Sequence, residues 1–305
     1  MATKRGGDSL WHFLATERTN PGSRRLDRLG IARTIALMQR EDRRVLAALA
    51  AARPALERAA RAFRQCLLDG GSCLLFGAGT SGRLAVLEAA ELPPTFGTDP
   101  RRVRAVIAGG RLAVFRAREG AEDRAREGAR GANDARPGDL VIGVSASSVT
   151  PFVRGALARA RARGARTVLV TASASPGLAR AAQIVVLLNV GPEVVAGSTR
   201  LKAGTATKLA LNQITTSAFA ASGKVFGPWM VGLRSGSAKL KDRAARIVSA
   251  AAGISPVRAR ALLAKAGGEV KTAILMGREG STATGARQRL AKAGGDLRAT
   301  LDKRR

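Results

Sequence analysis

A short glycine-rich stretch contains the residue types that hold a phosphate group. Residues 77–82 read GAGTSG and follow an apolar run. The glycines are spaced G-x-G-x-x-G, which is typical of a dinucleotide-binding turn between a strand and a helix. Gly79, Thr80, Ser81 and Gly82 present backbone amides and hydroxyls at the expected start of a helix, where an anion is stabilised. We therefore predict that this loop binds a phosphate or a sugar hydroxyl.

The dinucleotide alternative fails on a second requirement. A Rossmann site places an acidic residue at the end of the second strand, about 20 residues further on, where it binds the ribose hydroxyls. Here the second expected strand ends in VIAGG, with Gly109 and Gly110 in the place of that acid. The hydroxyls of Thr80 and Ser81 suit a monoester phosphate better than NAD. We therefore expect no nucleotide cofactor at this loop.

A second loop concentrates hydroxyl groups ahead of Pro151. Four such residues stand within six positions, namely Ser145, Ser147, Ser148 and Thr150. Serine and threonine are common helix N-caps, so capping alone could explain them. The loop, however, follows the third expected strand, and open parallel sheets bind ligands outside the carboxyl ends of their strands. We favour a phosphate site over simple capping.

A third candidate segment opens the long helix expected over 200–221. It spans residues 197–208 and reads GSTRLKAGTATK. Hydroxyls and cations gather at its start, namely Ser198, Thr199, Arg200 and Lys202. A phosphate or carboxylate is stabilised at such a helix N-terminus. The alternative is a capped helix with solvated cations, and both interpretations stay open at this stage.

These loops need a sheet to bring them together, and the sequence predicts one. Short apolar runs rich in β-branched residues are typical of buried strands. They occur at 73–76, 103–108, 140–144, 167–171 and 184–188, and helical patterns follow them at 80–91, 112–129, 150–163, 175–182 and 200–221. This alternation predicts an α/β fold with a parallel five-stranded sheet and helices on both faces.

Helical segments flank the predicted sheet. Residues 31–68 have helical apolar spacing interrupted by Pro54, which predicts two helices that meet there. No strand is expected after about residue 222, and Gly253, Ser255 and Pro256 predict a helix end followed by a helix start. We predict three parts: an N-terminal arm and helix (1–58), the sheet domain (59–224) and a small C-terminal helical domain (225–305).

Charge, histidine and cysteine content limit the classes of function. The 52 basic against 22 acidic residues give a net charge of +30, which could mark a nucleic-acid surface. Aromatic residues make up only 3% and Tyr is absent, so few side chains could stack on nucleic-acid bases. Solvated helix faces explain the charge better, and we expect no nucleic-acid partner. His12 is the single histidine, which excludes a His-based catalytic triad and a His/Cys metal cage. We expect a cytoplasmic protein without a membrane segment, because the sequence has two cysteines, no signal sequence and no apolar run of about 18 residues.

The order of the motifs resembles that of the N-acetylmuramic acid 6-phosphate etherases. The motifs are GAGTSGRL, PPTFG, AGG, EGAED, SAS followed by TP, GSTRLKAGTATKLALN and SGKVFG. These enzymes belong to the SIS (sugar isomerase) domain superfamily and are related to the glucokinase regulatory proteins. The similarity runs from about Thr16 to the C-terminus. It implies a SIS-type sheet that binds a sugar phosphate.

The resemblance also implies an activity: cleavage of the D-lactyl ether of N-acetylmuramic acid 6-phosphate, which gives N-acetylglucosamine 6-phosphate and D-lactate. A base removes the C2 proton, which lies α to the open-chain C1 aldehyde, and an acid protonates the lactate that leaves C3. Water then adds to the double bond. The resemblance assigns Glu91 as the proton donor and Glu122 as the base. It implies no metal or other cofactor, a homodimer with active sites at the subunit interface, and a role in cell-wall amino-sugar recycling.

The position of Glu91 raises a geometric question. The helix over 80–91 is expected to end just before Pro93 and Pro94, so Glu91 stands at the negative end of the helix dipole, which helps to keep it protonated. At about 1.5 Å per residue, Glu91 lies about 13 Å along the helix from the glycine loop. Either the helix ends earlier, or Glu91 completes a site in a second subunit. From spacing alone, Glu91 and Glu122 are explained better as surface residues of arginine-rich helices, so the resemblance carries both assignments.

The second hydroxyl loop departs from the pattern of the family. Where the family usually has Gly-Arg, this chain has Ser148 and Val149. The loss of the glycine restricts the backbone, and the loss of the arginine removes a cation that could contact an anionic group. A sugar-phosphate-sensing regulator without turnover is therefore the alternative to an etherase. Release of D-lactate distinguishes the two.

Overall fold

The computed structural model of the chain describes residue 14 and residues 16–173, 176–233 and 238–302. The chain divides into two compact units. The first comprises Met1–Ala89 and Arg102–Thr215, and the second comprises Ala90–Arg101 and Thr216–Arg305. Two long helices, α3 and α7, therefore contribute residues to both units.

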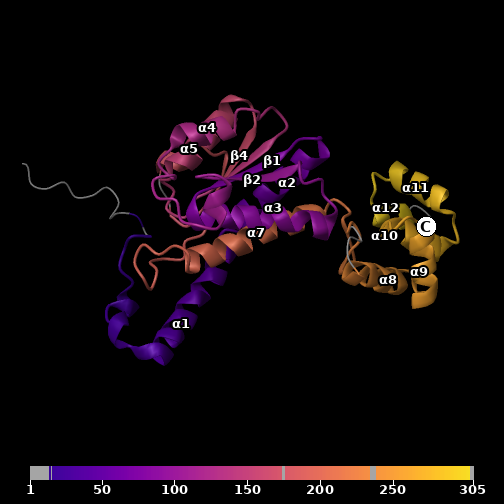
Figure 1. The fold of residues 1–305 in the computed structure, drawn as a ribbon, viewed down its shortest axis with the longest axis horizontal. Helices are drawn as coiled ribbons and strands as arrows, with labels where there is room; N and C mark the ends of the chain where they lie inside the picture. The colour runs from indigo at the N-terminus through magenta and orange to yellow at the C-terminus, as the bar shows by residue number, and fades with distance from the viewer. Residues whose placement is uncertain (1–13, 15, 174–175, 234–237, 303–305) are drawn as a thin grey trace, which may run out of the picture. The chain divides into compact units, whose positions relative to one another are not determined.

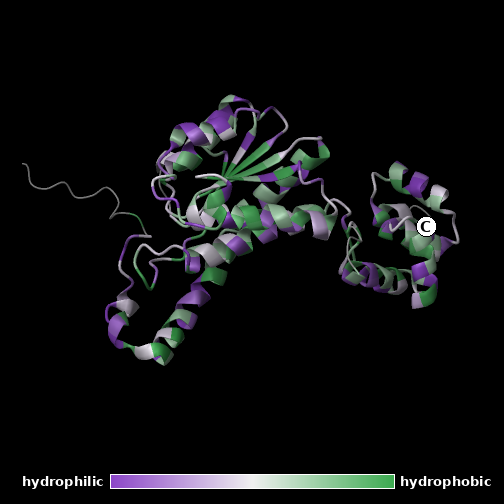
Figure 2. Ribbon diagram, in the orientation of Figure 1, coloured by the Kyte–Doolittle hydropathy of each residue, from purple (hydrophilic) through white to green (hydrophobic). Residues whose placement is uncertain are grey.

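The first unit contains a parallel five-stranded sheet, as the sequence predicts. Its strands follow the order β2-β1-β3-β4-β5. Their bounds are Cys73–Gly77 (β1), Val103–Ile107 (β2), Leu140–Val144 (β3), Arg166–Thr171 (β4) and Ile184–Leu187 (β5). All residues of β1 and β3 are buried, because both strands are central and helices cover the two faces. Figure 2 shows these strands as strongly hydrophobic.

Helices cover both faces of this sheet. In Figure 1, α4 and α5 lie together on one side of the strands and α3 lies on the other. Phe152 and Leu157 of α5 pack on Phe76, Val141 and Leu169 of the sheet. The helices are α1 (Gly30–Ala51), α2 (Arg53–Leu68), α3 (Gly79–Phe96), α4 (Ala125–Gly131), α5 (Pro151–Ala162), α6 (Pro176–Ala179) and α7 (Lys202–Ala220). This architecture confirms the predicted fold class.

The two predicted helices of the N-terminal arm meet where the proline requires it. Helix α1 ends at Ala51 and α2 begins at Arg53, so Pro54 occupies the first turn of α2. A proline is tolerated there because the first helical N–H groups have no intrahelical partner. The division predicted after residue 58 falls inside α2.

The prediction that α3 ends before Pro93 is wrong. The helix continues through Pro93 and Pro94 to Phe96, although neither proline can donate to the carbonyl four residues earlier. Packing at its end compensates, because Leu92 is buried and the Phe96 ring stacks on Phe219 with 4.5 Å between ring centroids. An early break of α3 is thus excluded.

The second unit consists mainly of short helices around their own apolar core, which includes Val248, Leu263, Ile274 and Leu290. Its helices are α8 (Ala238–Ala252), α9 (Pro256–Lys265), α10 (Val270–Glu279), α11 (Ala283–Lys292) and α12 (Leu297–Asp302). The predicted helix start is confirmed, because the Ser255 hydroxyl accepts a hydrogen bond from the amide of Arg258. The expectation of no further strand is wrong: Val225–Phe226 (β6) and Trp229–Met230 (β7) form a small antiparallel hairpin.

Among the described residues, no single helix is long and apolar enough to cross a bilayer. Helices α8 and α9 have the length and composition of a membrane span only when taken together, and the chain bends by 109° between them.

Candidate active site

The sheet brings the first two hydroxyl loops together. Strands β1 and β3 are neighbours, and their last residues, Gly77 and Val144, are register partners. The chain leaves β1 for β2 on one side and later returns to β3 on the other, which makes this a topological switch point. Ligands of open α/β sheets bind in the crevice that forms there. Loops 78–82 and 145–150 therefore start side by side at this crevice.

Close packing shapes the glycine loop. A β-carbon on Gly77 would lie 2.6 Å from the amide nitrogen of Gly82, and one on Gly82 would lie 2.7 Å from the carbonyl oxygen of Gly77. Both positions therefore require glycine, so that α3 can start directly against β1. Gly79 has φ +53, and Thr80 and Ser81 are half-buried at the start of the helix. The methyl group of Thr80 would lie 3.6 Å from a β-carbon on Gly204, so the loop also approaches the first turn of α7.

The second loop is not a simple helix cap. The side chain of Thr150, the N-cap of α5, makes no capping hydrogen bond and instead contacts the buried Ser145, with 2.8 Å between the hydroxyl oxygens. Ser147 is half-buried beside them. Ser148 is the one described non-glycine residue with positive φ, at +62, and its buried Oγ has no hydrogen-bond partner. Strain and an unpartnered buried hydroxyl therefore coincide in one residue of this loop.

Glu122 lies beside this second loop. Its carbonyl oxygen accepts a hydrogen bond of 2.9 Å from the amide of Phe152, in the first turn of α5. Helices α4 and α5 approach so closely that a β-carbon on Gly128 would collide with the Phe152 carbonyl. The Glu122 residue is exposed, but partial burial of its carboxyl raises its pKa, and the carboxylates of Asp123 and Glu119 add to the shift. Glu122 therefore carries a more basic carboxylate than an ordinary glutamate.

The start of α7 differs from the expectation of a free anion site. The Glu193 carboxylate accepts hydrogen bonds from the amides of Lys202 (3.1 Å) and Ala203 (2.8 Å). Burial raises the pKa of Glu193, and these two hydrogen bonds oppose that rise. Two of the amides that could hold a phosphate are therefore occupied. Ser198 and Thr199 are half-buried, and Arg200 is exposed, just before the helix.

The side chain of Lys202 is buried and forms an ion pair inside the protein. Its ammonium is 2.6 Å from a carboxylate oxygen of Glu41 in α1 and donates to the carbonyl of Pro192 at 2.7 Å. Asn20 also donates to Glu41, at 2.7 Å. Burial opposes ionisation of Glu41, but the hydrogen bonds from Lys202 and Asn20 outweigh it and lower the pKa of that carboxyl. The ammonium of Lys202 thus fixes the start of α7 to the N-terminal arm.

Glu41 and Glu193 therefore hold the start of α7, and the sequence did not reveal either contact. Glu193 stands nine positions before Lys202, too far for a capping motif to show. Glu41 is 161 positions from its partner. The one available signal was an acidic residue, Glu193, in the otherwise uncharged stretch VGPEVVAG before α7.

The other predicted catalytic glutamate belongs to the second unit. Glu91 is exposed on α3, and its carbonyl accepts a hydrogen bond from the Thr95 hydroxyl at 2.8 Å. Glu122 and the three candidate loops all belong to the first unit. Among the described residues, no group of three or more His, Cys, Asp and Glu side chains could hold a metal ion.

Comparison with known proteins identifies the family. The family model "Glucokinase regulatory protein N-terminal SIS domain" matches residues 56–161, and the model "SIS domain" matches residues 125–217. The N-acetylmuramic acid 6-phosphate etherase of Rubrobacter xylanophilus is 48% identical over 264 residues, which cover 86% of this chain and 88% of that protein. The etherase of Microcystis aeruginosa is 43% identical over 296 residues, 96% of either chain.

A similar solved structure is the phosphoheptose isomerase of Neisseria gonorrhoeae, with 19% identity and a TM-score of 0.45. It matches over 62% of this chain and 98% of that one. The curated relatives extend across both units of the chain, including the C-terminal helices. The chain belongs to the N-acetylmuramic acid 6-phosphate etherase family of SIS-domain proteins.

Proposed function

We infer that this protein is an N-acetylmuramic acid 6-phosphate etherase, a carbon–oxygen lyase that releases D-lactate and leaves N-acetylglucosamine 6-phosphate. The observation that carries this conclusion is the 43–48% identity to etherases along 86–96% of the chain. The carboxyl ends of β1 and β3, each followed by a hydroxyl-rich loop, suit a sugar phosphate. Nothing observed favours a regulator without turnover.

Glu122 is the proposed base for the C2 proton. Its backbone contact with Phe152 keeps it next to the loop that begins at Ser145, at the carboxyl end of β3. The raised pKa of its carboxyl makes the carboxylate a stronger acceptor for a carbon-bound proton. The open-chain aldehyde at C1 acidifies that proton, so a glutamate can remove it without a metal or another cofactor.

Glu91 is the proposed acid for the departing lactate oxygen, acting at a site completed by a second subunit. Since α3 does not end early, Glu91 stands well beyond the glycine loop along the helix. Exposed apolar side chains support a homodimer. Ile31, Ile35 and Leu46 repeat along one face of α1 and are 83%, 50% and 68% exposed. An apolar stripe of this kind is typical of a protein–protein interface.

A second apolar group is exposed close to the proposed base. Leu112 and Phe115, in the short turn after β2, are 60% and 80% exposed. They precede Glu122 in the chain by a few residues. A partner subunit covering this segment would shield Glu122 from bulk solvent and limit side reactions of the unsaturated intermediate, provided that the one water needed for hydration is admitted.

The phosphate and the sugar hydroxyls are bound, in this proposal, by groups of all three loops. These are Gly79, Thr80, Ser81, Gly82, Ser145, Ser147, Ser148, Thr150, Ser198, Thr199 and Arg200. Lys202 orients the third segment through Glu41 and makes no ligand contact of its own. The enzyme acts in the cytoplasm, in the recycling of cell-wall amino sugars.

Release of D-lactate from N-acetylmuramic acid 6-phosphate tests the proposal. The wild-type protein is expected to be active, and Glu91→Gln and Glu122→Gln to lose nearly all activity, because general acid–base catalysis contributes about 10²–10⁴-fold. Glu57→Gln, an exposed glutamate on α2, is the matched control and is expected to keep full activity. The absence of lactate release from folded wild-type protein would refute the etherase assignment. Full activity of Glu91→Gln would refute its role as the acid.

A further inference from the structure

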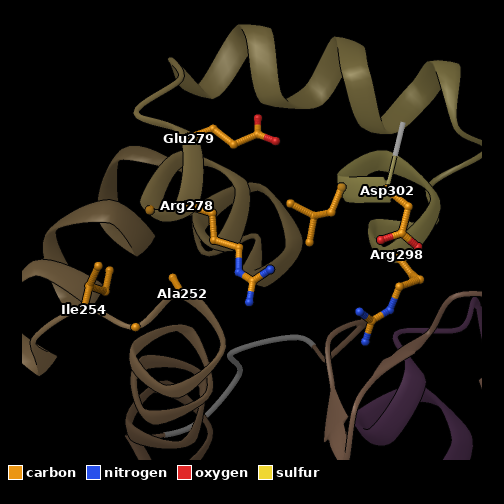
Figure 3. A pocket seen from close by; sticks show the side chains of 9 residues that line it. Ala252, Ile254, Arg278, Glu279, Arg298 and Asp302 are labelled. Atoms are coloured by element: carbon orange, nitrogen blue, oxygen red, sulfur yellow. The ribbon is translucent and has the colours of Figure 1, made fainter. Parts of the chain in front are cut away.

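A pocket in the second unit lies outside the proposed reaction. Its volume is about 570 Å³, within the usual range for small-molecule sites. It is lined by the C-terminal ends of α8 and α10 and by α12, and it shares no residue with the three loops of the first unit (Figure 3). Its polar groups include two arginines, Arg278 and Arg298, and two acids, Glu279 and Asp302.

Both arginines are held in place by a phenylalanine ring. The guanidinium carbon of Arg278 lies 5.7 Å from the centroid of the Phe226 ring, and that of Arg298 lies 4.5 Å from the same centroid. Arg278 Nε also donates to the carbonyl of Ala251 at 2.9 Å. Among the hydrogen bonds of the described residues, this Nε contact is the one that Arg278 makes, which leaves its terminal nitrogens to bind an oxyanion. Pre-organised guanidinium groups lose little entropy when they bind an oxyanion.

The pocket has more arginines than carboxylates outside ion pairs among the described residues. None of the ion pairs formed by the described residues includes Arg278, Arg298 or Asp302. Glu279, by contrast, pairs with Arg289 from α11. Within residues 16–173, 176–233 and 238–302, the pocket therefore holds two arginines and one aspartate that form no ion pair with one another or with other described residues. Figure 3 shows the guanidinium groups of Arg278 and Arg298 directed to the same side, and Arg298 and Asp302 stand four positions apart on α12.

We propose that this pocket binds a small phosphate monoester, with the phosphate between Arg278 and Arg298 and a hydroxyl group of the ligand donating to Asp302. A planar guanidinium matches the geometry of phosphate oxygens, and two arginines that line the same pocket carry the charge to neutralise a dianion. The carboxyl ends of α8 and α10 carry partial negative charge, which favours the hydroxyl end of the ligand over its phosphate. The apolar side chains of Ile254 and Leu301 offer surface for the carbon skeleton.

The fluorescence of Trp229 offers a measure of ligand binding at this pocket that does not depend on enzyme activity. It pairs with Phe226 across the β6–β7 hairpin, next to the ring that holds both arginines. The chain has two tryptophans, so Trp11→Phe leaves Trp229 as the single fluorophore. In that background, the full-length protein is titrated with glucose 6-phosphate and, separately, with inorganic phosphate, and calorimetry gives the number of sites.

We expect a saturable change of Trp229 fluorescence with both probes. Arg278→Gln and Arg298→Gln are expected to weaken binding at least about tenfold, since each removes a charge-assisted hydrogen bond. Arg260→Gln, an exposed arginine of α9, is the matched control and is expected to bind as the parent does. If Arg278→Gln fails to fold because it loses the Ala251 contact, Arg298→Gln carries the test. Unchanged affinity in Arg298→Gln, or no saturable signal with either probe, would overturn the proposal.

Asp302→Asn tests the orientation of the ligand. Removal of the negative charge is expected to tighten inorganic phosphate, because a repulsion disappears, and to weaken glucose 6-phosphate, because a hydroxyl acceptor becomes poorer. Equal tightening of both probes would show that Asp302 does not contact a hydroxyl. Calorimetry also counts the site proposed in the first unit, whereas the Trp229 signal and its change in Arg298→Gln and Asp302→Asn concern residues of the second unit. The outcome is therefore separate from that of the lactate assay.

Discussion

Replacement of Ser148 by glycine is expected to stabilise the protein and to weaken its substrate binding. Ser148 has φ +62, and its buried hydroxyl has no partner. A non-glycine residue in such a conformation costs on the order of 1–3 kcal/mol, and an unpartnered buried hydroxyl costs a similar amount. The greater freedom of glycine in the unfolded chain cancels about 0.5–1 kcal/mol. The balance favours Ser148→Gly by about 1 kcal/mol or more, which raises Tm by about 2–4 °C for a chain of this size.

Ser148→Ala separates strain from hydroxyl chemistry. It removes the hydroxyl but keeps a β-carbon at positive φ, so its gain in Tm is expected to be smaller than that of Ser148→Gly. If the hydroxyl contacts the substrate, both variants are expected to raise KM for N-acetylmuramic acid 6-phosphate by about tenfold or more. Thermal unfolding and lactate-release kinetics on the same preparations measure both effects. A lower Tm for Ser148→Gly would refute the strain argument, and an unchanged KM in both variants would refute the contact.

The Glu41–Lys202 pair predicts a loss of stability: Glu41→Gln leaves a buried ammonium without a charged partner and is expected to cost about 3 kcal/mol in urea unfolding. Because the pKa of Glu41 is lowered, its stabilisation is complete above the unfolded value of 4.5 and is lost as the pH falls through the folded pKa. The Tm difference between wild type and Glu41→Gln should therefore shrink on acidification, and a constant difference would contradict the pairing. Gly82→Ala is expected to cost about 2 kcal/mol or more, because its β-carbon would lie 2.7 Å from the Gly77 carbonyl; an unchanged urea midpoint would argue against this close approach. The pKa of Glu122 is raised, so kcat/KM is expected to fall on acidification with a midpoint above the ordinary glutamate value of 4.5. This acidic fall should be absent from the residual rate of Glu122→Gln. A midpoint at 4.5 in the wild type would point to another base.

The parts of the fold that could be predicted are those fixed by local sequence. The strands are short apolar runs, and the glycine loop is specified by its own spacing, so both could be recognised without knowledge of the rest of the chain. The bend at Pro54 likewise follows from one residue. The carboxyl ends of β1 and β3 then fix which loops share an edge of the sheet.

The features that sequence did not reveal depend on distant partners. Helix α3 passes through two prolines because Phe96 stacks on Phe219, more than a hundred residues away. Lys202 has the sequence context of an anion ligand, but Glu41 neutralises it from the N-terminal arm. The β6–β7 hairpin has two residues in each strand, too few for an alternating pattern to show.

The buried contact between the arm and α7 has a practical consequence for protein engineering. Deletion of α1 to obtain a shorter, better-crystallising enzyme would remove the carboxylate that neutralises the Lys202 ammonium and leave it with the Pro192 carbonyl. Such a truncation should therefore be combined with a neutral side chain of similar length at position 202, for example methionine. The deletion of α1 and the substitution at position 202 should be made together, although Glu41 and Lys202 are 161 positions apart in the sequence.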